Sequence, residues 1–182
     1  MMKRLLICAG ALFAASLTMS AQPKAPASPS ATASATVAGK TISITYSSPR
    51  VKGREGQIFT KDGLISHDPH YPVWRAGANA ATTLHTDADL KIGDLMVPKG
   101  AYTLFVDISN PDQWELIINK KTGEWGLAYD STQDLGRVKM NMSKPVAMVE
   151  NLTYSVTGLG GTTGKIALEW ENHSASVLFA VH

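Results

Sequence analysis

Apolar and polar residues alternate along most of the chain between residues 42 and 181. The clearest run is 101–109, in which every second residue is large and apolar: Tyr102, Leu104, Val106 and Ile108. The alternation recurs in 41–46, 114–118, 138–142, 152–156, 166–170 and 177–181. A period of two places successive side chains on opposite faces of a strand, and no segment has the three-four spacing of a long amphipathic helix. The pattern therefore predicts β-strands throughout.

Turn residues separate these runs at short intervals. Gly93-Asp94 lies between two apolar triplets and predicts a tight hairpin, and a second turn follows at Pro98-Lys99-Gly100. Short connections favour antiparallel pairing, because a parallel crossover needs a dozen or more residues. We expect an all-β fold of two packed antiparallel sheets, a jelly-roll-like sandwich, with a closed β-barrel as the alternative.

The N-terminal segment has a different composition. Lys3 and Arg4 precede an apolar run over 5–17, and small residues follow up to Ala21. This pattern is typical of a cleaved secretory signal over residues 1–21. Residues 22–36 contain Ala, Pro, Ser and Thr but no large apolar side chain, which predicts a disordered leader. The remaining residues, 37–182, are expected to form a single domain.

Charge and cysteine content exclude several classes of function. The single cysteine, Cys8, lies in the predicted signal, so the mature chain should contain no disulfide and no thiol chemistry. Loss of Lys3 and Arg4 reduces seventeen basic residues to fifteen, equal to the fifteen acidic ones. A neutral protein has no overall field that attracts nucleic acid, and no later apolar run reaches membrane-spanning length. We therefore expect a periplasmic or secreted protein without a nucleic-acid partner or a membrane span.

Two unusual runs contain the candidate binding residues. Three bases alternate in 50–54, and a Trp-Arg pair begins the turn-like run 74–79. Arginine suits a carboxylate or a phosphate, and Trp with Arg suits the flat face of a ring or sugar. The candidate ligand-binding residues are Arg50, Lys52, Arg54, Trp74, Arg75 and Asn79. Because such charges are costly to bury alone, we expect the two runs to meet in space.

A structural interpretation of the same residues is at least as strong. Arg75 and Arg54 would pair with Glu55 or Asp62 and hold the long loop, while Trp74 would lie in the core. The 67–70 stretch adds His67 and His70 as weak metal candidates, but a metal site needs further ligands. No cofactor motif is present: the Gly-rich run 158–165 has the wrong spacing for a phosphate loop and is followed by a strand.

Several ordered motifs resemble the DUF2911 family of exported bacterial proteins of unknown function. They are Ser48-Pro49-Arg50-Val51-Lys52-Gly53-Arg54, Val73-Trp74-Arg75-Ala76-Gly77-Ala78-Asn79 and Pro98-Lys99-Gly100-Ala101-Tyr102-Thr103-Leu104. Trp125-Gly126 and the 114–120 and 166–170 segments are similar as well. The resemblance implies an exported β-rich domain and supplies no reaction, cofactor or catalytic residue.

Two classes of function remain. The first is a non-catalytic module that binds a small anionic or sugar-like ligand, or an envelope partner. The second is a hydrolase of envelope or imported polymers that uses Asp or His residues near the long loop. No Gly-x-Ser-x-Gly elbow or mature cysteine supports nucleophilic catalysis, which favours the binding module.

The predicted signal leads to a test of export. In its native host, the protein should begin at or near Ala21 or Gln22 and lie outside the cytoplasm. Mass spectrometry of the N-terminal peptide from fractionated cells measures both properties. An intact N-terminus in the cytosolic fraction would contradict the prediction.

Overall fold

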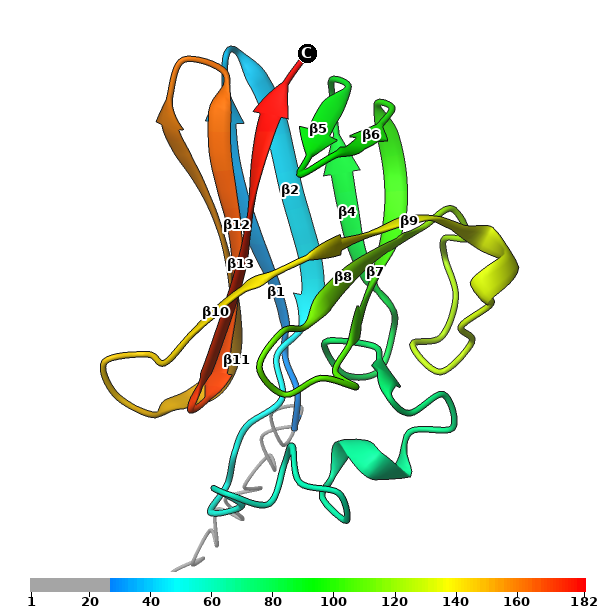
Figure 1. Ribbon diagram of the computed structural model, residues 1–182, viewed down its shortest axis with the longest axis vertical. Helices are drawn as coiled ribbons and strands as arrows, with labels where there is room; N and C mark the ends of the chain where they lie inside the picture. Colours follow the sequence, from blue (N-terminus) through cyan, green and yellow to red (C-terminus); the bar gives the residue numbers. More distant parts are fainter. Residues whose placement is uncertain (1–26) are drawn as a thin grey trace, which may run out of the picture.

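The computed structural model describes residues 27–182, which form thirteen strands and two short 3-10 helices, η1 (Ile65–His67) and η2 (Ser131–Gln133). The first sheet has the order β1-β2-β4-β7-β8-β9, with β3 paired to β7 (Figure 1). Its strands are β1 (Ser30–Val37), β2 (Lys40–Ser47), β3 (Val73–Trp74), β4 (Thr82–Thr86), β7 (Gly100–Asp107), β8 (Glu115–Asn119) and β9 (Asp134–Lys139).

The second sheet has the order β11-β12-β13-β5-β6, with β10 paired to β13. Its strands are β5 (Leu90–Ile92), β6 (Leu95–Val97), β10 (Asn141–Ser143), β11 (Val149–Gly160), β12 (Thr163–Glu171) and β13 (His173–Val181). The predicted hairpin at Gly93-Asp94 is confirmed, because β5 and β6 pair antiparallel on either side of it.

The two sheets pack face to face, which confirms the predicted sandwich. Every pair of strands in the described part of the chain is antiparallel. The core between the sheets contains fully buried side chains from both, such as Ile44 and Leu104 from one and Leu152 and Ile166 from the other. No ladder in residues 27–182 joins the two sheets, so the barrel alternative is wrong. None of the helices in this range is long and apolar enough to cross a membrane.

The predicted boundary of the domain at residue 37 is wrong. Residues 30–36, expected in a disordered leader, belong to β1, which pairs with β2 along its whole length. Ala31, Ala33 and Ala35 face the core and alternate with Ser and Thr. The ladder with β2 and the buried Val37 at the end of the strand hold this edge strand, although its other core-facing side chains are small. The predicted signal and the start of the leader, residues 1–26, lie outside the described residues.

The run 75–81 leaves the first sheet between two strands that share one edge of β7. Trp74 in β3 pairs with Val106, and Thr82 in β4 pairs with Leu104. The chain therefore advances eight residues, from 74 to 82, while β7 advances two, from 106 to 104. The intervening residues cannot remain in the ladder, so they project from one end of the sandwich.

The long loop over 48–72 closes the same end of the sandwich (Figure 1). Its first residues join β11 of the second sheet: the Val51 amide donates to the Glu150 carbonyl at 2.8 Å, and the Ser48 hydroxyl donates to the Leu152 carbonyl at 2.7 Å. Ile58 further along the loop is fully buried in the core. The loop is thus tied to the second sheet and to the core.

Gly164 allows the packing between β12 and β13 to be tested. Gly164 lies opposite Phe179, whose ring occupies the space where a Cβ of residue 164 would be. Gly164→Ala should therefore lower the free energy of unfolding by about 1–3 kcal/mol, as overpacking does. Gly158, directly opposite Gly164 on β11, is the matched control, because its added Cβ would lie 3.5 Å from the nearest side-chain atom.

Urea unfolding of both variants measures the difference. Gly158→Ala should stay within about 0.5 kcal/mol of the parent protein. Equal stability of the two variants would contradict the register of these strands.

Candidate ligand-binding cleft

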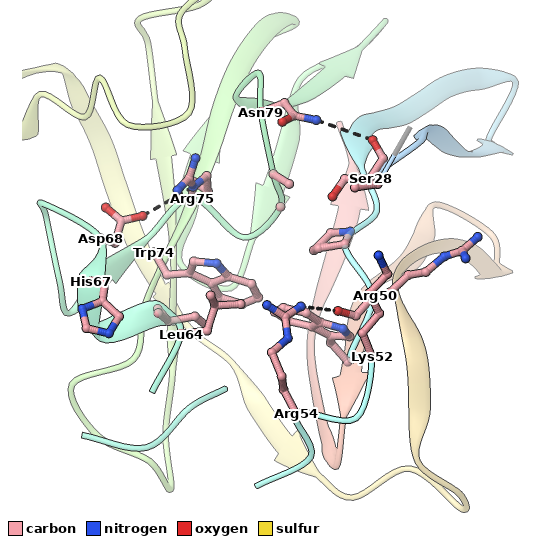
Figure 2. A pocket seen from close by; sticks show the side chains of 16 residues that line it. Ser28, Arg50, Lys52, Arg54, Leu64, His67, Asp68, Trp74, Arg75 and Asn79 are labelled. Carbon is pink, nitrogen blue, oxygen red and sulfur yellow. Dashed lines mark hydrogen bonds and ion pairs between the residues drawn. The ribbon is translucent and has the colours of Figure 1, made fainter. Parts of the chain in front are cut away.

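A cleft of about 740 Å³ opens where the two unusual runs meet (Figure 2). All six candidate residues line it: Arg50, Lys52, Arg54, Trp74, Arg75 and Asn79. The expectation that the two runs meet in space is therefore confirmed. Further walls come from Ser28, from residues around η1, and from Trp170 at the end of β12. Ligand binding by these residues stays a prediction.

Buried hydrogen bonds fix the backbone of the run 75–81. The Ala76 carbonyl accepts from the Thr82 hydroxyl and from the Tyr154 hydroxyl, each at 3.1 Å. Tyr154 belongs to the second sheet, and burial raises the pKa of its phenol above the ordinary value, so it remains a neutral donor. The Asn79 carbonyl accepts from the Gly126 amide at 3.0 Å. This wall of the cleft is therefore anchored to both sheets and to the 120–128 loop.

Trp74 is a core residue, as the structural interpretation predicted. Only 3% of its surface is exposed. Its ring stacks on Trp170, with centroids 5.9 Å apart and planes 16° apart, and meets Phe59 edge to face at 5.5 Å. Trp74 therefore contributes to the floor of the cleft and offers no free face for a sugar.

Arg75 combines a structural and a cleft-lining position. Its Nε lies 3.5 Å from Asp68 Oδ2, and the Asp68 side chain is only 5% exposed. The aliphatic part of Arg75 packs over Gly126, where an added Cβ would lie 2.8 Å from Arg75 Cδ. The ion pair was expected, but Glu55 and Asp62 were the wrong partners. Asp68 takes that place because it follows η1, which turns the chain toward Arg75, and its Oδ1 also accepts the His70 amide at 3.2 Å.

The 50–54 run is not extended, so the alternation of its three bases does not place them on one face of a strand. Lys52 and Gly53 both have positive φ, 50° and 72°, and the chain turns there. Arg54 stabilises this turn by donating from Nε to the Val51 carbonyl at 2.9 Å and from Nη2 to the Arg50 carbonyl at 2.6 Å. The turn still brings all three bases to the cleft. In Figure 2 the Arg54 guanidinium faces the Trp74 side, while Arg50 extends outward.

The cleft has an excess of positive charge. Three arginines and one lysine line it, and Asp68 is the one carboxylate among the lining residues. Within residues 27–182, only one of these bases, Arg75, forms an ion pair with an acid. Lysine and arginine side chains donate hydrogen bonds and accept none. The cleft therefore suits a ligand that carries negative charge and acceptor oxygens.

The two weak metal candidates are not brought together. His67 is exposed and lines the cleft. His70 instead approaches the Leu127 carbonyl, 3.0 Å from its Nε2, and packs against the Tyr129 ring. In the part of the chain that the structure describes, no group of three or more His, Cys, Asp or Glu side chains could hold a metal ion.

Sequence reasoning missed Asp68 as the partner of Arg75, and it missed Trp170 as a lining residue. In the sequence, Asp68 is one residue of the His-rich 67–70 stretch, and no local pattern marks it as the partner of Arg75. Trp170 belongs to the alternating 166–170 run. This pattern predicts a core position, but it does not show that the position borders a cleft.

The Arg75–Asp68 pair can be tested by a double-mutant cycle. Arg75→Ala should lower the free energy of unfolding by about 2 kcal/mol, because it leaves a nearly buried carboxylate without its cation. Asp68→Asn should cost less, since the amide oxygen can still accept the His70 amide. The double variant should be more stable than Arg75→Ala alone.

Chemical denaturation of the three variants gives these values. Lys40→Ala, at an exposed position at the far end of β2, is the control and should stay within about 0.5 kcal/mol of the parent. Additive effects of Arg75→Ala and Asp68→Asn would show that the two side chains do not interact.

Comparison with known proteins gives one match. The model of a family described as a protein of unknown function, DUF2911, matches residues 28–179, nearly all of the described chain. No curated protein and no solved structure matches. The family match begins just before β1, in agreement with the inclusion of that strand in the domain. The chain therefore belongs to the DUF2911 family.

Proposed function

We propose that this protein is an exported, non-catalytic domain that binds a small anionic ligand in the cleft between the 50–54 and 74–79 runs. One observation carries the proposal: among residues 27–182, three arginines, one lysine and a single carboxylate line a cleft of about 740 Å³. The mature chain is expected to be neutral, so this cluster is a local feature and not a consequence of overall charge.

Two properties of the cleft support a ligand instead of a purely structural role for the bases. Arg50 and Lys52 are exposed, and neither forms an ion pair with an acid of residues 27–182. Arg75 and Arg54 are held in place by bonds to the protein, so they are positioned before a ligand arrives. Groups that are fixed in advance lose less entropy on binding.

The anionic ligand is favoured over a neutral sugar. Stacking on a sugar needs an exposed aromatic face, and Trp74 is almost completely buried. The cleft instead offers donors from guanidinium and ammonium groups, which match carboxylate or phosphate oxygens.

A hydrolase is the second candidate, because His67 and Asp68 also line the cleft. Both carboxylate oxygens of Asp68 are already engaged, one by the Arg75 guanidinium and one by the His70 amide. A general base must lie within hydrogen-bond reach of the proton that it takes up, and the Asp68 carboxylate is directed at the Arg75 guanidinium and the His70 amide instead. Release of fragments from purified peptidoglycan or polysaccharide, abolished by Asp68→Asn, would establish the hydrolase in place of the binding module.

Isothermal titration calorimetry with inorganic phosphate, sulfate and citrate tests the proposal. At least one anion should bind. Its affinity should fall roughly fivefold to tenfold when the salt concentration rises from about 50 mM to about 500 mM, because salt screens partly exposed charges. A neutral disaccharide serves as the comparison ligand and should not bind.

The matched variants change charge at and away from the cleft. Arg50→Gln with Lys52→Gln should weaken anion binding about tenfold or more, since each loses an electrostatic contact of about 1 kcal/mol. Lys40→Gln with Lys99→Gln removes two charges at the opposite end of β2 and β7 and should leave the affinity unchanged. No heat with any anion, or equal loss in both double variants, would contradict the proposed cleft.

A further inference from the structure

One buried polar atom beside the cleft has no hydrogen-bond partner. Trp170 is 2% exposed, yet it lines the cleft. Its Nε1 has no acceptor within residues 27–182 and is closed to solvent. Buried donors in native proteins are nearly always paired, so each exception calls for an explanation.

The neighbours of Trp170 do not share this combination. The other unpaired buried atom of the described chain is His173 Nδ1, which lies 3.4 Å from Glu171 Oε2 and so has an acceptor close by. Trp114 is also 2% exposed and belongs to the same aromatic cluster, but it does not line the cleft. Among residues 27–182, Trp170 alone combines an unpaired buried donor with a position at the site.

Packing holds the Trp170 indole in a fixed orientation. Its ring stacks on Trp74 and meets the Phe59 ring at 5.8 Å and 78°. The N–H direction is therefore set before a ligand binds. Such a preorganised donor adds directional selectivity that the long, flexible side chains of Arg50 and Lys52 cannot supply.

We infer that the Trp170 indole N–H is a ligand donor, and that the ligand is a small oxyanion that places one oxygen on it while the bases of the cleft neutralise its charge. This inference rests on the proposed function. An acceptor reaches Nε1 when a lining side chain shifts. Leu64, a lining side chain that is 41% exposed, can shift without breaking a side-chain hydrogen bond or an ion pair of the described chain.

The indole signals in a ¹H–¹⁵N correlation spectrum test this directly. The chain has four Trp residues, and single Trp→Phe variants assign their four indole signals. On titration with inorganic phosphate, the Trp170 signal should move downfield and its exchange with water should slow. The Trp114 signal should stay in place, because that ring lies in the same cluster but away from the cleft.

The outcomes separate the inference from the proposed function. If backbone signals of the 50–54 and 74–79 runs move while the Trp170 indole signal does not, the inference is overturned and the proposed function stands. If no signal of the cleft moves at saturating phosphate, both the inference and the proposed function are contradicted. If the Trp170 N–H contacts only the Phe59 ring, its indole signal will not respond to phosphate. That result also overturns the inference.

Affinities of two variants give a second measurement. Trp170→Phe keeps an aromatic ring and removes the donor, so it should bind phosphate about tenfold more weakly, the loss expected for one hydrogen bond to a charged acceptor. Trp114→Phe is the matched control and should retain the affinity. Equal affinities of the two variants would overturn the inference.

Discussion

The edge of β7 imposes the constraint on which the cleft depends. Two strands, β3 and β4, pair with the same edge, and the residues between them exceed what the ladder can accommodate. The excess must leave the sheet, and it does so at the end of the sandwich that the 48–72 loop also closes. The Ala76 carbonyl then accepts hydrogen bonds from two buried hydroxyls, one from each sheet. These bonds fix the direction in which residues 75–81 project.

The same anchoring explains how the cleft can hold several bases near one another. Arg75 forms an ion pair with Asp68, and Arg54 donates hydrogen bonds to the carbonyls of its own turn. Arg50 and Lys52 remain exposed, where water stabilises their charge. The protein therefore avoids burying an unpaired cation, and it still presents the positive charge at a single concave surface.

The sequence was a good guide to the fold and a partial guide to the cleft. The period-two alternation identified the large strands because their apolar faces must pack in one core. It could not identify β1, whose alanines are too small to give a strong signal and whose pairing depends on β2. The two unusual runs were recognised by their charges and by Trp74. The partner of Arg75 depends on the path of the 48–72 loop, and Trp170 borders the cleft only because β12 ends there; neither follows from local pattern.

The fold forms the cleft before a ligand binds. Hydrogen–deuterium exchange of backbone amides tests this claim most directly, because exchange reports local opening. The amides of Val51 and Gly126, which donate to Glu150 and Asn79, hold the two walls. In the ligand-free protein both should be protected to a degree similar to the amides of β7 and β8. Exchange of both amides at the rate of an unstructured peptide, while the strands stay protected, would show that the walls open independently and would contradict the claim.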